Sequence, residues 1–465
     1  MNADPSPDRR GPTEAQPPRG EVSGFDQRLE TLRDRAGSTL NQIEDLAAQV
    51  SLEGAAQDAL ERAADAEYDR TLELFWPRFS ADAHAVKLSS VDPQVLGNIV
   101  VSPTAAGPVK PGTVLVAAPF SFRVPDSSIG VHAALTIPLS DYALKLAPAR
   151  RGLAAQRAAV GDDAVAARRR ARVAAVELFY GKLRAEAALA VVEQAHALAV
   201  KNLAAAKARV DAGAGSKAEV AAFEAQVARS ELSLVATKDA VRLTGERLDR
   251  LLMLPDGQAV TAKEDLLAPL PAMVPNREAL TEQALSSRAE LKALDERMKA
   301  LDAQATVQRA SYFPRLDGAA EATYANPNQR YFPPPDAFKP SAQVGVQLSW
   351  SLTDAVQAGA AVRATDAQRA AVEAQRAAFV QQIKVDLFDL ADRVESVETQ
   401  LSASAHALDA AGEALRVRER LYENGAGTST ELLDAQNTFV AAQFAALEAR
   451  VEQRRARRLL ELATQ

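Results

Sequence analysis

The sequence predicts a mainly α-helical protein with a small β part, in which long helical hairpins occur twice and are accompanied by four short strands. Three observations support this fold class. A glycine turn is duplicated, long stretches with helical periodicity flank both copies, and four short segments alternate apolar and polar residues. Aromatic residues make up only 5% of the chain, which suits extended helices better than globular cores.

Each glycine turn carries the signals that end one helix and begin the next. The first reads GAGSKAEV at 213–220, and the second reads GAGTSTEL at 425–432. The glycines stop the first helix, Ser216 is the expected N-cap of the next, and Glu219 completes a capping box. In the second copy, Thr428 is the expected N-cap and Glu431 completes the capping box. Both elements are therefore predicted to be tight turns between antiparallel helices.

Two further motifs repeat in the same order as the turns. WPRF at 76–79 returns as FPRL at 313–316, and LTIPLSD at 135–141 returns as LSWSLTD at 348–354. Three motifs repeated in one order indicate a tandem duplication.

The duplication predicts the domain organisation. We expect residues 1–24 to be a disordered segment, 25–254 the first repeat, 255–275 a linker rich in proline and glycine, and 276–465 the second repeat. Residues 1–23 show no apolar region of the kind found in secretory signals.

Each repeat is predicted to contain a helix, two strands, a long helix, the turn and a return helix. The strands are expected at about 78–88 and 130–140 in the first repeat and at about 315–325 and 341–352 in the second. Residues 89–130, rich in Pro, Gly and Ser, are expected to form a long loop.

The first helix of each repeat is expected at about 25–75, broken near Gly37 and Gly54, and at about 276–311. The long helices should span about 142–212 and 354–424, so each reaches about 100 Å at about 1.5 Å per residue. The second long helix has the heptad spacing of a coiled coil. Its apolar positions are Ile383, Leu387, Leu390, Val394, Val397, Leu401, Leu408, Leu415 and Tyr422.

Composition argues against several classes of protein. The formal net charge is −7 and there is no cysteine, so we expect no nucleic-acid partner, no disulfide and no thiolate metal site. The arginine clusters at 168–172 and 454–458 are interpreted as solvated helix faces.

No stretch has the roughly 20 apolar residues of a transmembrane helix. Without a catalytic motif or ligand spacing, we expect no enzyme, no cofactor and no metal.

The predicted strands have about the length of transmembrane β-strands. Four strands leave two open edges, so one chain cannot close a membrane barrel, whereas an oligomer could. Trp350 and Tyr324 would then suit an aromatic girdle at the membrane surface. The alternative is a soluble antiparallel sheet that caps a coiled coil.

The duplicated arrangement of helix, two strands, long helix, turn and return helix resembles the TolC-like outer-membrane efflux proteins over about residues 25–463. The second turn is the most specific part of the resemblance. Residues 422–435, YENGAGTSTELLDA, are similar to the family signature Tyr-x-x-Gly-x-x-Thr-x-x-Asp-Val-Leu-Asp-Ala.

The resemblance implies a homotrimer whose twelve strands form one β-barrel in the outer membrane of a Gram-negative bacterium. The helices would form a tunnel, a coiled-coil α-barrel, across the periplasm. Such a channel is the passive exit duct of a tripartite efflux pump, joined to an inner-membrane pump by a periplasmic adaptor. The adaptor would contact the turns, at Gly213, Ala214, Gly215, Gly425, Ala426 and Gly427.

The family pattern also implies a channel gate near the turns. Glu431 and Asp434 align with acidic residues that ring the constriction, Glu219 with the acidic position of the first hairpin, and Tyr422 with a gate tyrosine. Threefold rings of carboxylates favour cations. One departure is Gly427, where some members carry a gate arginine, so a latch of the Tyr–Arg–Asp type is not expected.

Two other functions remain open at this point. The chain could serve type I protein secretion instead of efflux, or it could be a soluble coiled-coil scaffold.

Overall fold

The computed structural model describes residues 30, 36–89, 91, 95–102, 108, 111–121, 125–271, 273–333 and 335–465. The segment predicted to be disordered, residues 1–24, lies outside these residues. Contacts divide the chain into two compact units: one of residues 1–59, 161–293 and 376–465, and one of residues 60–160 and 294–375. Each unit takes residues from both predicted repeats.

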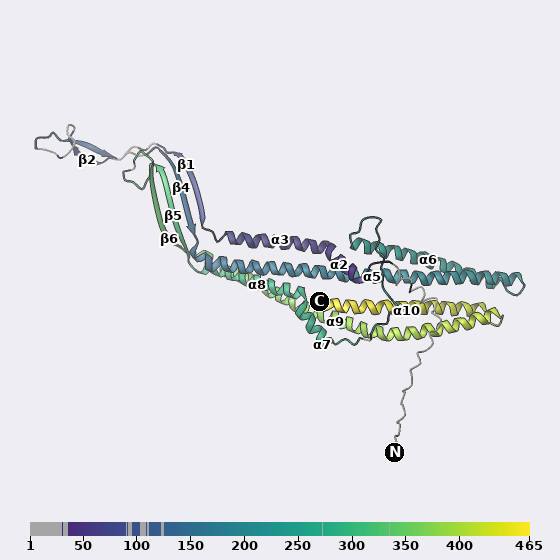
Figure 1. Cartoon of the computed structure of the whole chain (residues 1–465). Coiled ribbons are helices and arrows are strands. Elements are labelled where there is room, and N and C mark those ends of the chain that lie inside the picture. The colour runs from purple at the N-terminus through teal and green to yellow at the C-terminus, as the bar shows by residue number, and fades with distance from the viewer. Residues whose placement is uncertain are drawn as a thin grey trace, which may run out of the picture. The chain divides into compact units, whose positions relative to one another are not determined.

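Helices dominate both units (Figure 1). Their bounds are α2 (Leu40–Val50), α3 (Leu52–Glu73), α4 (Leu139–Asp141), α5 (Ala147–Asp211), α6 (Lys217–Leu251), α7 (Arg277–Ser287), α8 (Ala289–Arg309), α9 (Leu352–Glu423) and α10 (Ser429–Ala463), with a π-helix η1 (Tyr142–Leu146) and a 3-10 helix η2 (Ala310–Tyr312). Among the described residues, no helix combines the length and the apolar character needed to cross a bilayer.

The unit of residues 60–160 and 294–375 contains a four-stranded antiparallel sheet in the order β1-β4-β5-β6 (Figure 1). The strands are β1 (Arg78–Lys87), β4 (Ser127–Ile137), β5 (Arg315–Asn326) and β6 (Lys339–Ser349). They lie where alternation of apolar and polar residues predicts strands. β1 and β6 form the two edges of the sheet, and neither edge is paired within the described part of the chain.

The register sorts the side chains of this sheet onto two chemically distinct faces. On the polar face, Asp82, His132, Thr323 and Ser341 are aligned across the four strands. The apolar face carries Val344, Val346 and Leu348 of β6, which are 85%, 74% and 69% exposed, and it also carries Phe79, Val131 and Tyr324. Water can solvate the polar face of this sheet, but the exposed apolar face needs an apolar environment to cover it.

The long loop expected at 89–130 was predicted wrongly, because it contains a second sheet. β2 (Val95–Val101) pairs antiparallel with β3 (Val116–Ser121), with an irregular register between Val95 and Gly97. The apolar run of β2 does not alternate with polar residues, and Pro119 lies inside β3. Both features hide strands from a search for period-two patterns.

The predicted first helix of each repeat is interrupted. The helix expected at 276–311 breaks at Arg288, which is buried and whose Nε donates to the carbonyl of Ala463 at 2.9 Å. In the first repeat the break lies at Ser51, three residues before Gly54, near which it was predicted. The hydroxyl of Ser51 accepts a hydrogen bond from the Gly54 amide at 3.1 Å, as an N-cap of α3 does.

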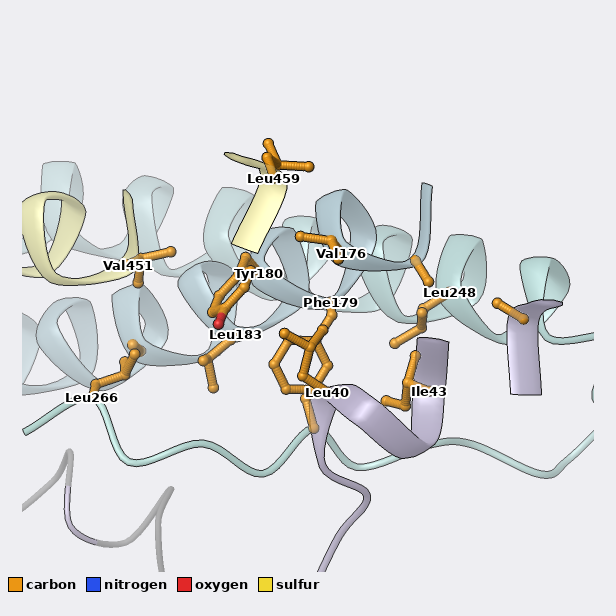
Figure 2. Close-up of a cluster of buried hydrophobic side chains, with 14 of the residues drawn as sticks. Leu40, Ile43, Val176, Phe179, Tyr180, Leu183, Leu248, Leu266, Val451 and Leu459 are labelled. Carbon is orange, nitrogen blue, oxygen red and sulfur yellow. The ribbon is translucent and has the colours of Figure 1, made fainter. Parts of the chain in front are cut away.

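The core of the other unit lies where α5, α6 and α10 meet α2 and the segment predicted as a linker (Figure 2). Phe179 and Leu183 of α5 pack with Ile43 of α2 and Leu248 of α6, and all four are buried. Leu266, from the predicted linker, is buried in the same cluster. That segment therefore belongs to the core and does not simply connect two halves.

Residues next to α2 fix this segment in place. The Ser38 amide donates to the Thr261 carbonyl at 2.9 Å, and the Lys263 amide donates to the Ser38 carbonyl at 3.0 Å. A Cβ at Gly37 would lie 2.5 Å from the Thr261 carbonyl oxygen, so only glycine fits there.

The heptad prediction for the second long helix is confirmed, because α9 buries Ile383, Leu387, Val394, Val397, Leu415 and Tyr422.

The interpretation of the arginine clusters as solvated faces was wrong for several members. Arg454 is 5% exposed and donates to the carbonyls of Asp265 and Ala268, both at 2.6 Å, with Glu264 at 3.5 Å. Burial lowers the pKa of Arg454 and raises the pKa of Glu264. Arg169 likewise pairs with Glu290 at 2.7 Å in a half-buried position. Sequence periodicity cannot reveal an inward-facing arginine whose partners are distant carbonyls.

Candidate functional site

The two glycine turns have nearly the same backbone geometry. Gly213 has φ 74° and Gly425 has φ 72°, values that favour glycine. The Ala214 amide donates to the Arg209 carbonyl at 2.8 Å, and the Ala426 amide donates to the Leu421 carbonyl at 2.9 Å. These bonds span six residues and satisfy carbonyls at the helix C-terminus, as in a Schellman motif.

The helix after each turn begins with the predicted capping box. The Glu219 amide donates to the Ser216 hydroxyl at 3.2 Å, and the Glu431 amide donates to the Thr428 hydroxyl at 3.3 Å. In return, each glutamate side chain accepts from the amide of its cap residue. Both glutamates are thus structural residues of their turns, whatever further role they have.

Tyr422 and Glu219 link the two hairpins. The Tyr422 hydroxyl, at the end of α9, donates to the Glu219 Oε1 at the start of α6. Tyr422 is 5% exposed, while Glu219 is half-buried. Burial and the hydrogen bond to Glu219 raise the pKa of Tyr422 to about 12, so the hydroxyl keeps its proton at neutral pH.

Arg209 holds the same tyrosine from α5. Its guanidinium lies 4.7 Å from the centre of the Tyr422 ring and donates to the Tyr422 carbonyl at 2.8 Å. The Phe223 ring of α6 meets the Tyr422 ring edge-on at 5.9 Å. Leu432 of α10 is buried in the same cluster, so all four helices contribute to one contact beside the turns.

Glu431 and Asp434 lie apart from this contact. Both are exposed on the first turns of α10. Arg418 of α9 lies 3.4 Å from Glu431. The pKa of Glu431 is lowered, first by the backbone amide of Thr428 and then by the charge of Arg418. Of the four predicted gate residues, the structure thus brings Tyr422 and Glu219 together and leaves the other two exposed.

Arg209 and Arg418 were not predicted from the sequence. A comparison of the two repeats could have singled them out. Each arginine lies a few residues before its turn, and the equivalent position of the other repeat has no arginine. The residues of the turns themselves, Gly213, Ala214, Gly425 and Ala426, are exposed, while Gly215 and Gly427 are half-buried.

The predicted girdle residues lie at opposite ends of the sheet. Trp350 follows the last residue of β6, and Tyr324 pairs with Pro340 at the other end. Both are exposed, and the Tyr324 ring stacks on Phe338 with centroids 5.3 Å apart. Among the described residues, no group of His, Cys, Asp or Glu side chains has the arrangement of a metal site.

Comparison with known proteins identifies the type of structure. Residues 280–464 match the model of a protein family described as outer membrane efflux protein. The match lies in the second half of the chain and agrees there with the family resemblance in the sequence. No curated protein matches the chain.

Solved structures of outer-membrane proteins share the fold of this chain over nearly its whole length. The channel OprN is 19% identical, with 98% of both chains covered and a TM-score of 0.70. The Campylobacter jejuni CmeC channel is 12% identical over 91% of this chain and 85% of its own, with a TM-score of 0.71. VceC of Vibrio cholerae is 16% identical over 91% of this chain and 94% of its own, with a TM-score of 0.67. The mainly α fold class with a small antiparallel β part is thereby confirmed.

Proposed function

We propose that three copies of this chain form a passive exit duct in the outer membrane of a Gram-negative bacterium. The four-stranded sheets would join edge to edge into one barrel, and the helices would extend the channel through the periplasm. An inner-membrane pump would supply the energy and a periplasmic adaptor would connect the two, with Gly213, Ala214, Gly425 and Ala426 among the contacts.

The observation that carries this proposal is the sheet. Its apolar face is exposed, its polar face bears Asp82, Glu321 and Gln343, and both edges are open. A membrane barrel needs this pattern, because lipid faces the apolar side chains and water fills the lumen. Closure of the edges in an oligomer would satisfy the backbone groups that one chain leaves unpaired.

The spacing of the aromatic residues supports the same proposal. The strand from Arg315, beside Trp350, to Tyr324 spans about 30 Å at about 3.3 Å per residue. At a strand tilt of about 40° this corresponds to a height of about 23 Å, close to the apolar band of about 25 Å in membrane barrels. Trp350 and Tyr324 would thus lie at the two membrane surfaces.

The experiment extracts the protein from membranes with detergent, measures the mass of the particle and records currents in planar bilayers. A trimer with stable conductance is expected. A monomer that needs no detergent and conducts no ions would refute the proposal and favour a soluble scaffold. Type I protein secretion and efflux would both give this trimer, and no feature of the structure favours secretion.

The gate is part of the same proposal. Threefold symmetry would repeat Glu431 and Asp434 as two rings of carboxylates at the narrow end of the helical tunnel, and the bond between Tyr422 and Glu219 would hold the hairpins closed. Support comes from the exposure of both carboxylates and from the position of the Tyr422 contact beside the turns.

Glu431→Ala combined with Asp434→Ala should raise single-channel conductance and weaken block by multivalent cations. The matched control is Asp239→Ala with Glu246→Ala, which removes two exposed carboxylates beside Arg242 on α6. If both double variants behave like the wild type, Glu431 and Asp434 are not the gate.

A further inference from the structure

A cavity of about 340 Å³ opens on the polar face of the sheet, at the end where β5 and β6 are connected. His84 of β1, Glu321 of β5 and Gln343 of β6 line it, together with Asn328 and Arg330 of the connecting loop. None of these residues belongs to the helical turns. The cavity thus combines sheet and loop residues in an arrangement that the proposed gate does not use.

The loop is fixed over the polar face by Asn328. This loop residue is only 4% exposed. Its Nδ2 donates to the Lys339 carbonyl at 2.9 Å and to the Ser341 hydroxyl at 3.0 Å, while its Oδ1 accepts from the Arg330 amide at 3.0 Å. A side chain with this set of bonds orders the turn that leads to Arg330.

Arg330 reaches back from the loop to the sheet. Its guanidinium donates to the Gln343 Oε1 at 3.0 Å, and the Gln343 Nε2 donates to the Glu321 Oε2. The Gln343 amide thus lies between the Arg330 guanidinium and the Glu321 carboxylate. Within the described part of the chain, the guanidinium of Arg330 has the neutral Gln343 amide as its side-chain partner, and no direct ion pair neutralises its charge.

Exposure decides which of the two charges a passing solute meets first. Arg330 is exposed, whereas Glu321 is half-buried behind Gln343. On the neighbouring strand, Gly130 makes room for His84, because a Cβ there would lie 3.1 Å from the His84 Cε1. The side of the cavity that faces water is consequently dominated by the positive charge of Arg330.

We propose that Arg330 is a selectivity-determining residue, which Asn328 and Gln343 hold over the lumen side of the sheet so that it favours anionic solutes. The inference rests on the proposed function, because the polar face borders a pore only if the sheets close into a barrel. Three copies would place three guanidinium groups around the loop end of that pore. This charge lies at the opposite end of the sheet from the junction with the helices.

The test measures the ratio of cation to anion permeability of the full-length trimer in planar bilayers with a KCl gradient. Arg330→Gln should raise this ratio about twofold, because a unit charge about one Debye length away changes the energy of a small ion by a fraction of RT. Arg330→Lys keeps the charge and should stay close to the wild type. Asn328→Ala, which releases the loop, should shift the ratio in the same direction as Arg330→Gln.

Lys87→Gln is the matched control. It removes one positive charge at the same end of the sheet, but Lys87 lies in the register of the apolar face and pairs with Asp126 at 2.6 Å. The proposal is overturned if Arg330→Gln leaves the ratio unchanged or if Lys87→Gln shifts it equally. A wild-type protein without conductance would instead overturn the proposed channel and, with it, the selectivity role of Arg330.

Discussion

Tyr422→Phe is the smallest change that tests how the hairpins are held together. It removes one hydroxyl, which donates to Glu219, and keeps the ring that packs against Phe223 and beneath the Arg209 guanidinium. Shape and apolar contact are therefore preserved. Any change in channel behaviour can be assigned to the lost hydrogen bond.

The expected magnitude follows from the burial of the two partners. A hydrogen bond to a charged group contributes about 1.5–3 kcal/mol, and the lower value applies because Glu219 is only half-buried and can be rehydrated. Three chains would together lose about 4–5 kcal/mol if opening breaks all three bonds. The ratio of closed to open channels should then fall roughly a thousandfold.

The assay is the open probability of single channels in planar bilayers between pH 6 and 9. Because the pKa of Tyr422, about 12, lies above its ordinary value of 10.0, the stabilisation is complete below pH 10 and is lost as the pH rises towards 12. The wild type should thus stay closed across the assay range. Tyr324→Phe, on the apolar face of the sheet, is the control. Equal open probabilities for Tyr422→Phe and wild type would refute the reasoning.

Three further predictions concern thermal or denaturant unfolding of the detergent-solubilised protein. Arg454→Met should lower the free energy of unfolding by about 3 kcal/mol, since it removes a buried cation from Glu264 and two carbonyls. Arg242→Met, in an exposed pair, should change the free energy of unfolding much less, and equal losses would contradict the assigned burial. Gly425→Ala should destabilise by about 1 kcal/mol because of its positive φ, while Gly181→Ala, in a helix with open space, should not destabilise. Because the pKa of Glu431 is lowered, the ionised side chain stabilises the folded protein fully above pH 4.5, and this stabilisation is lost at more acidic pH. Glu431→Gln should therefore reduce the fall in the midpoint temperature of unfolding between pH 7 and 3. An unchanged fall would show that Glu431 does not contribute to stability.

Local patterns in the sequence were sufficient for much of the fold. The alternation in β6 and the heptad stripe of α9 each reflect one face that must be buried or covered, so they can be read without knowing the partner. The capping boxes at Ser216 and Thr428 are equally local, because their partners lie three residues away. Such elements are set by neighbours in the chain.

Features that depend on distant partners could not be predicted. Arg454 lies in a run of arginines that periodicity assigns to solvent, and only the fold brings the carbonyls of Asp265 and Ala268 to it. The same holds for the site, where Tyr422 and Glu219 each stand in a recognisable motif but nothing in either motif specifies their bond. The resemblance to a family implies that both residues belong to a channel gate, but it does not indicate that Arg209 contacts the tyrosine.

The pairing of β4 with β5 has a consequence for how the chain folds. β1 with β4 and β5 with β6 are pairs within one half of the sequence, whereas His132 on β4 and Thr323 on β5 are separated by 191 positions. Closing a flexible loop of that length costs about 5 kcal/mol of chain entropy. We therefore expect the pairing of β4 with β5 to form after the pairings of β1 with β4 and of β5 with β6, once a ribosome has synthesised the chain at least as far as β5.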